Sequence, residues 1–127
     1  YNIVEDELER LLRDVESNAI IKDGILVYKF SSKLRLKSTL ANILAEIHPN
    51  RIIVVAQQVG NEIHFSLRRG RRIKVDLGNL VKKAISGLEC ATGGGHPEAA
   101  AGRLPKKHFN LFVENLSRRL MEKNKLY

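Results

Sequence analysis

The feature that most constrains the fold of this chain is an unbroken apolar run from Ile52 to Ala56. Such a run predicts a strand that is covered on both faces and lies at the centre of a layered sheet. After a turn at Gly60-Asn61, the residues Ile63, Phe65 and Leu67 alternate with polar side chains. This alternation predicts a second strand, with one face in the core and one polar face.

Helical and extended patterns alternate along the rest of the chain. Apolar side chains recur at helical spacing in residues 4–15, 38–47, 76–87 and 105–120. Ser38 and Asp76 are the predicted N-caps of two of these helices, and Pro105 is predicted to open the last one. Asp23-Gly24 predicts a hairpin over residues 20–30, and a short strand is expected over residues 98–104. Together these patterns predict an α/β fold: a single small domain with a mixed β-sheet of about five strands flanked by helices.

The two ends of the chain predict its domain organisation. Residues 1–18 have an acidic amphipathic pattern, which predicts a lead-in helix from a preceding domain, and residues 19–127 are expected to form the domain itself. Tyr1 is a bulky residue that would not normally follow an excised initiator methionine, so we expect a fragment of a longer protein. No segment approaches the roughly 18 consecutive apolar residues of a membrane span, which predicts a cytoplasmic protein with no membrane partner. The single cysteine, Cys90, excludes an internal disulfide and a cysteine-based zinc site, and it is expected to be buried.

The charge of the chain favours a polyanionic partner. Its 22 lysines and arginines exceed its 14 acidic residues and give a net charge of +8. A dense group of cations follows the second predicted strand, and we expect it to contact a nucleic-acid backbone through Arg69, Arg71, Arg72 and Lys74. A solvated turn that keeps a sheet edge from pairing would also explain this cluster. A second group, which alternates before a helix, is interpreted as a solvated segment: Lys33, Arg35 and Lys37.

Three glycines followed by a histidine form the most distinctive motif of the sequence: Gly93, Gly94, Gly95 and His96. Without β-carbons, the backbone of such a loop approaches a phosphate closely and points several N–H donors at it. His96 would add a hydrogen bond or, when protonated, a positive charge. A flexible turn would also explain the three glycines.

The residues around this motif resemble a known family. The string from Gly93 to Gly102 resembles the G-G-G-H-x-x-A-A-G signature of the C-terminal, substrate-binding domain of DHH-family phosphoesterases. The segment from Phe65 to Arg68 is similar to the family's second element, a strand with serine and arginine two residues apart. The sequence departs from the signature at Ala101, which stands where the family usually has its first glycine after two alanines.

The resemblance implies a nucleic-acid- or phosphate-binding domain of a RecJ-like single-strand exonuclease or oligonucleotide phosphodiesterase. In that family role, the residues expected to bind phosphate are Ser66, Arg68, Gly93, Gly94, Gly95 and His96. The implied partners are single-stranded nucleic acid or a short oligonucleotide, together with the DHH catalytic domain of the same parent chain. Since no Asp-His-His string is present, no catalytic residue, metal ligand or cofactor is expected in this chain. Manganese or magnesium is expected in the missing catalytic domain, and this chain alone is expected to hydrolyse no phosphodiester.

Two other functions stay open at this point. A non-catalytic RecJ-related replication factor would use such a domain to bind DNA and replication proteins. A small-molecule phosphodiesterase is the third possibility, although the large positive charge suits a long polyanion better. The N-terminal sequence of the parent chain would separate the first two functions, because an intact Asp-His-His set indicates an enzyme.

Overall fold

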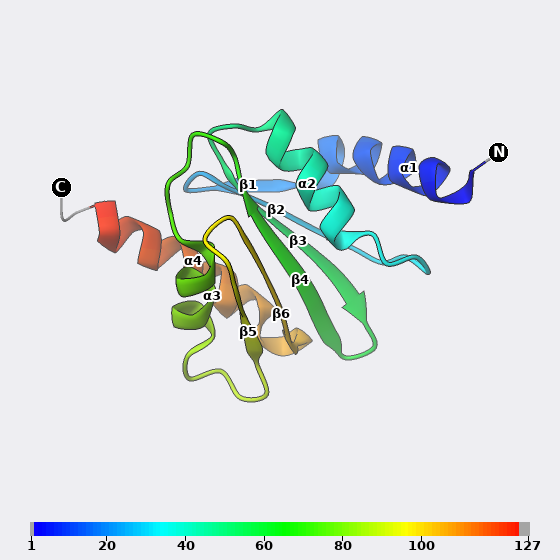
Figure 1. Cartoon of the computed structure of the whole chain (residues 1–127). Helices are drawn as coiled ribbons and strands as arrows, with labels where there is room; N and C mark the ends of the chain where they lie inside the picture. Colours follow the sequence, from blue (N-terminus) through cyan, green and yellow to red (C-terminus); the bar gives the residue numbers. More distant parts are fainter. Residues whose placement is uncertain (1, 125–127) are drawn as a thin grey trace.

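The computed structural model describes residues 2–124, which form a six-stranded sheet with helices on both faces (Figure 1). The helices are α1 (Ile3–Asn18), α2 (Lys37–Ile47), α3 (Leu77–Ile85) and α4 (Phe109–Asn124), and the short 3-10 helix η1 (Lys106–His108) precedes α4. The strands are β1 (Ile20–Lys22), β2 (Ile25–Phe30), β3 (Ile52–Val59), β4 (Glu62–Arg69), β5 (Thr92–Gly95) and β6 (Ala99–Pro105). Their order across the sheet is β1-β2-β3-β4-β6-β5. The predicted α/β fold with a mixed sheet is confirmed, with six strands in place of about five.

The strand β3 lies in the middle of the sheet, as its apolar run predicts. It pairs in parallel with β2 and antiparallel with β4, in a register that sets Val54 opposite Val27 and Leu67. Ile53, Val54 and Val55 have no exposed surface. The helix α2 connects the parallel strands β2 and β3, because such strands need a crossover that returns the chain to the same end of the sheet.

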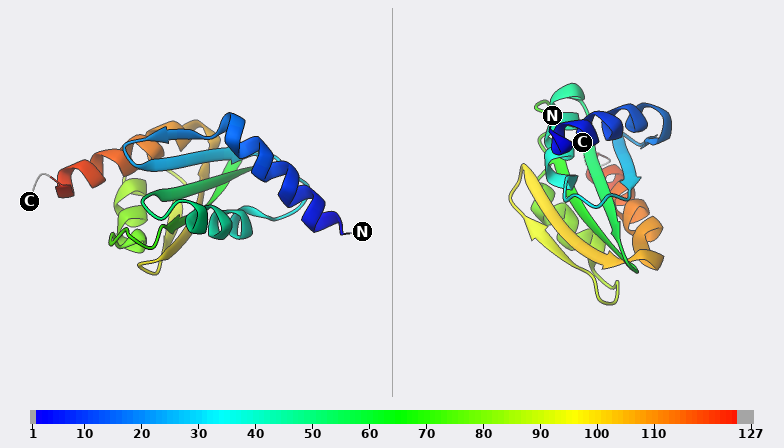
Figure 2. Two further views of the ribbon diagram at one scale, coloured as in Figure 1. Left: turned by 90° about the horizontal axis from the view of Figure 1, so that it is seen from above. Right: turned by 90° about the vertical axis from the view of Figure 1, so that its right-hand side faces the viewer.

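Each face of the sheet has its own hydrophobic core. Phe65 and Leu67 of β4 pack with α3 and α4, whereas Ile53 and Val55 of β3 pack with α1 and α2. The right view of Figure 2 shows α1 and α2 apart from α4. Because alternate residues of a strand point to opposite faces, the polar face of β4 is turned toward α2.

The helix α1 is joined to the domain by apolar and polar contacts. Leu11 packs in the core under α2, and Asp14 accepts a hydrogen bond of 2.5 Å from the hydroxyl of Tyr28. Glu7 accepts hydrogen bonds from Arg10 and from Ser32, each at 2.5 Å. These two partners lower the pKa of Glu7 to about 2, and the Tyr28 hydroxyl holds the pKa of Asp14 below its ordinary value.

We expect the contribution of Glu7 to stability to depend on pH. Since the pKa of Glu7 falls from 4.5 to about 2 on folding, its contribution is present above pH 4.5 and is lost as the pH falls toward 2. Glu7→Gln should therefore lower the free energy of unfolding at pH 7 by more than it does at pH 3. Urea denaturation at both pH values measures this, with Glu16→Gln on an exposed side of the same helix as the control. If Glu7→Gln lowered the free energy of unfolding equally at the two pH values, the lowered pKa of Glu7 would be contradicted.

Three local predictions were wrong. Ser38 does not cap α2, because Leu36 is the N-cap without a side-chain hydrogen bond and the Ser38 hydroxyl bonds instead with Ser66 at 2.9 Å. Pro105 ends β6 and is the N-cap of η1, so one 3-10 turn separates it from the start of α4. Cys90 is exposed, with a φ of 62° just before β5. The partner of Ser38 lies on another element, which no local sequence pattern reveals.

None of the helices within residues 2–124 is long and apolar enough to cross a membrane.

Candidate phosphate-binding site

The three-glycine run forms the edge strand β5 rather than the loop that was predicted. It pairs antiparallel with β6, and Gly93 lies opposite Gly102. A side chain would have no room at either glycine. A Cβ atom at Gly102 would lie 2.6 Å from Cζ of Phe65, and one at Gly93 would lie 2.9 Å from Cγ1 of Val81. The two glycines therefore let the β5–β6 hairpin pack directly on the core.

The outer edge of β5 keeps backbone donors that a phosphate can use. Because β5 is the last strand of the sheet, the N–H and C=O groups on its outer edge have no strand to pair with. The side chain of Lys82 lies beside this strand, with Cε 3.2 Å from the place of a Cβ atom on Gly94. The edge thus combines backbone donors with a nearby cation.

The turn that carries His96 is fastened to the N-terminus of α3. The N–H of Gly78 donates to the carbonyl of His96 at 3.1 Å, and the N–H of Leu77 donates to the carbonyl of Pro97 at 2.8 Å. Asp76 caps the same helix, as predicted. The N–H groups of Leu77 and Gly78 therefore hold the backbone of the β5–β6 turn and are not free to bind a phosphate. His96 itself is exposed.

The register of the sheet brings Arg68 and His96 to the same end of the molecule. Arg68 on β4 lies opposite Ala99 on β6, and the carbonyl of Ala99 accepts the N–H of His96 at 2.9 Å. Arg68 is half-buried, and its Nε donates to Oδ1 of Asn42 on α2 at 2.7 Å. Burial lowers the pKa of Arg68, and the bond to Asn42 fixes the direction of the guanidinium group.

Ser66 lies on the same strand face as Arg68 but has no exposed surface. Its hydroxyl bonds with Ser38 and so joins α2 to β4. A direct phosphate contact by Ser66 stays a prediction, and it requires α2 to move away from the strand.

The predicted basic cluster begins at Arg69, the last residue of β4, and continues in the loop between β4 and α3, at the same end as Arg68. Arg71, Arg72 and Lys74 are exposed, whereas Arg69 is half-buried and donates to the carbonyl of Val75 at 2.8 Å. Three of the four cations that were predicted to contact a nucleic-acid backbone are therefore accessible to solvent. The fourth, Arg69, holds the loop in place through its bond to Val75.

Other cations lie far from this end. Lys106 and Lys107 follow β6, and the N–H of Lys106 donates to the carbonyl of Asn61 at the turn between β3 and β4. The antiparallel pairing of β4 with β6 therefore places them at the opposite end of the sheet from Arg68.

Two residues of α2 contribute to the site unexpectedly: Asn42 was not named as a candidate, and Lys37 was interpreted as part of a solvated segment. Asn42 positions Arg68, and the pKa of Lys37 is lowered by burial and by the positive charges of Arg35 and Arg68. Their part in the site depends on the packing of α2 across β4, and no motif in the sequence signals that packing.

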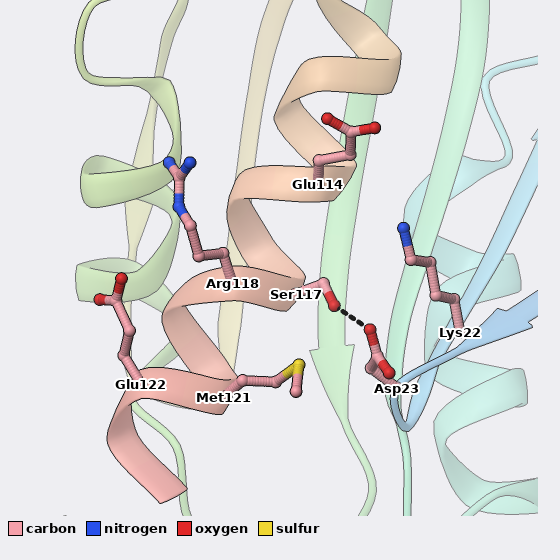
Figure 3. A pocket seen from close by; sticks show the side chains of 7 residues that line it. All are labelled: Lys22, Asp23, Glu114, Ser117, Arg118, Met121 and Glu122. Atoms are coloured by element: carbon pink, nitrogen blue, oxygen red, sulfur yellow. Dashed lines mark hydrogen bonds between the residues drawn. The ribbon is translucent and has the colours of Figure 1, made fainter. Parts of the chain in front are cut away.

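A separate hollow of about 330 Å³ lies between the β1–β2 turn and α4 (Figure 3). Asp23 in the turn accepts a hydrogen bond from the hydroxyl of Ser117 across it. The lining carries both signs of charge: Lys22, Asp23, Glu114, Ser117, Arg118, Met121 and Glu122. This hollow lacks the excess of positive charge that a phosphate requires.

Within residues 2–124, no three side chains of His, Cys, Asp or Glu are grouped so that they could hold a metal ion. The metal chemistry of a phosphoesterase therefore does not fit the described part of this chain.

The family model of the DHHA1 domain matches residues 25–122. The chain belongs to the DHHA1 domain family. This match confirms the resemblance that the glycine-histidine motif carries. The DHHA1 domain includes every predicted site residue, whereas α1 and β1 precede the matched range. Among curated protein sequences, none matches the chain significantly.

Solved structures share the fold of this DHHA1 domain. RecJ from Thermus thermophilus in complex with Mg²⁺ matches with a TM-score of 0.73 and 17% identity, over 93% of this chain and 18% of RecJ. PggH, a pGpG-specific phosphodiesterase from Vibrio cholerae, matches with a TM-score of 0.62 and 12% identity, over 92% of this chain and 40% of PggH. CDC45 from Entamoeba histolytica matches with a TM-score of 0.68 and 10% identity, over 89% of this chain and 27% of CDC45. This chain thus spans less than half of each of these three proteins.

Proposed function

We propose that this DHHA1 domain binds single-stranded nucleic acid or a short oligonucleotide and presents it to a DHH catalytic domain on the same parent chain. Arg68 and His96 hold a phosphate at the end of the strand, and the exposed edge of β5 contributes backbone N–H groups. The catalytic metal, magnesium or manganese, belongs to the DHH domain. RecJ structures have been determined with each of these ions, which supports magnesium or manganese as the metal of a RecJ-like parent chain.

The observation that carries this proposal is the register of β4, β6 and the β5–β6 turn. It sets a fixed, half-buried arginine and an exposed histidine on either side of Ala99, although they come from different parts of the chain. A guanidinium group binds phosphate oxygens with two parallel hydrogen bonds, and the bond from Nε to Asn42 orients the group beforehand. An oriented guanidinium group with a histidine placed two strands away in the same register favours a specific phosphate site over a diffuse positive surface.

The neighbouring loop extends the site along a polyanion. Arg71, Arg72 and Lys74 are exposed on the loop that leads from β4 to the N-terminus of α3, and that helix holds the His96 turn. The net charge of +8 supports the same class of partner. A non-catalytic parent chain that binds DNA and replication proteins stays the alternative.

Binding should depend steeply on salt. Each strand phosphate that is neutralised releases counterions, so the logarithm of the affinity should fall by about 0.7 per contact for each unit rise in the logarithm of salt concentration. Arg71→Ala should reduce this slope by about one contact's worth, or about 0.7. Fluorescence anisotropy with a single-stranded oligonucleotide at several salt concentrations measures both quantities. A salt-independent affinity, or no binding at low salt, would favour the protein-docking alternative.

A further inference from the structure

The cations that were interpreted as a solvated segment instead line a pocket of about 220 Å³. The pocket lies where the loop after β2, the start of α2, the end of β3 and the start of β4 meet. Its lining consists of Ser32, Lys33, Arg35, Lys37, Gln57, Gln58, Val59 and His64. It is therefore on the α2 side of the sheet, on the same strand face as Arg68.

Positive charge in this pocket has no counter-charge in the lining. Lys33, Arg35 and Lys37 line it together with His64, and none of its lining residues is acidic. Two carboxylates contact lining residues from outside the pocket: Glu7 accepts hydrogen bonds from Ser32 and Arg10, and Oε1 of Glu62 lies 3.5 Å from Nε2 of His64. Neither carboxylate is bonded to Lys33, Arg35 or Lys37 among the described contacts. The lowered pKa of Lys37 shows that its charge is disfavoured by burial and by Arg35 and Arg68. A bound anion would relieve this repulsion.

The wall of the pocket is held in place by Gln57. Only 5% of Gln57 is exposed, and its Nε2 donates to the carbonyls of Ser32 at 3.1 Å and Leu34 at 2.9 Å. These bonds fix the loop that carries the cations. The helix α2 begins beside the pocket without a side-chain cap, and the N–H of Leu40 donates to the carbonyl of the N-cap residue Leu36. The preceding N–H groups add to the positive potential at this point.

We propose that this pocket binds a phosphate group, and that it holds an internal phosphate of an oligonucleotide whose end lies at Arg68 and His96. The assignment of this phosphate to the inside of an oligonucleotide rests on the proposed function. His64 at the pocket and Arg68 lie on one face of β4, separated by about 13 Å for four residues of strand. An extended nucleic-acid strand bridges such a distance within a few nucleotides, so one ligand reaches both places.

The first test uses inorganic phosphate alone. Titration into ¹⁵N-labelled protein should shift the backbone amide signals of residues 37–39 and 57–58 in a saturable manner. A variant with Arg35→Gln and Lys37→Gln should lose this saturation, and the single variant Lys37→Gln should weaken it. The control, Lys83→Gln with Arg119→Gln, removes two exposed charges from α3 and α4 and should bind like the unmodified protein. Shifts that stay linear with phosphate concentration, or that saturate equally in the pocket variant, would overturn the proposal.

The same titration separates the pocket from the end site. Saturable shifts confined to residues 96–99 would overturn the pocket and leave the proposed function standing. Shifts confined to the pocket would support the pocket and count against Arg68 and His96 as a phosphate site.

The second test compares ligand lengths. The Arg35→Gln and Lys37→Gln variant should bind a single-stranded oligothymidylate at least about tenfold more weakly, because the cations that hold the internal phosphate are lost. Binding of thymidine monophosphate at the end site, followed by the amide signals of residues 96–99, should stay as before. An equal loss for both ligands would overturn the assignment of an internal phosphate, and so would no loss for either one.

Discussion

Gly78→Ala is expected to destabilise this domain, although alanine is the better helix former. At an ordinary position inside a helix, replacing glycine by alanine stabilises by about 1 kcal/mol. Here a Cβ atom would lie 2.3 Å from the carbonyl oxygen and 2.8 Å from the carbonyl carbon of Gly95. Both atoms belong to the backbone of β5 and cannot turn aside as a side chain can. The helix α3 must therefore move away from β5. We expect a loss of about 1–3 kcal/mol in the free energy of unfolding, as for other overpacked positions.

The same change should disturb the phosphate site. Separating α3 from β5 weakens the hydrogen bonds from Leu77 and Gly78 that hold the His96 turn. Urea denaturation gives the change in stability, and the amide signals of residues 96–99 report the turn. Lys83→Ala, at an exposed position of the same helix, is the matched control and should change stability little. A stabilising effect of Gly78→Ala would show that α3 does not pack on β5 in this way.

Gly102→Ala should have an effect of similar size for a different reason. A Cβ atom on Gly102 would lie 2.3 Å from the carbonyl oxygen of Thr92, 2.6 Å from Cζ of Phe65 and 2.8 Å from Cα of Gly93. The pairing of β5 with β6 and the packing of the hairpin on Phe65 cannot both be kept. We expect a loss of about 2 kcal/mol or more, since two of the three atoms belong to the backbone.

A neighbouring position on the same strand provides the control for Gly102. Ala101→Val adds more volume than Gly102→Ala, but Ala101 is exposed and faces away from Phe65. Its effect on the free energy of unfolding should stay within about 0.5 kcal/mol. Equal losses for the two variants would mean that the close contact at Gly102 is absent in solution.

Most elements of the fold could be predicted because their signals are local. The apolar run in β3 and the alternation in β4 depend only on neighbouring residues, and both strands were predicted correctly. The hairpin at Asp23-Gly24 and the cap at Asp76 are also local, and the structure has both. The glycine run was taken for a loop because glycine is a poor strand former. In the structure this run pairs with β6 as a strand. Only glycine fits there, because Gly102 on β6 and the ring of Phe65 leave no room for a side chain.

The parts of the site that depend on packing could not be predicted. The sequence places Ser66 on a polar strand face, which is typical of an exposed position. The structure covers that face with α2, so Ser66 is buried and Arg68 is bonded to Asn42. The same packing turns Lys33, Arg35 and Lys37 from an apparent solvated segment into the lining of a pocket. The positions of Lys106 and Lys107 follow from strand register, which the sequence does not define.

The central claim is that Arg68 and His96 hold one phosphate at the end of a strand, and a double-mutant cycle tests it most directly. Affinities of Arg68→Ala, His96→Ala and the double variant should be measured for one oligonucleotide with and without a terminal phosphate. With the phosphate, each single change should weaken binding, Arg68→Ala by about tenfold, and the double change should cost less than the sum of the two. Without it, both changes should matter little. If the two changes prove additive, and the terminal phosphate makes no difference to either, the two residues do not share a phosphate and the claim is contradicted.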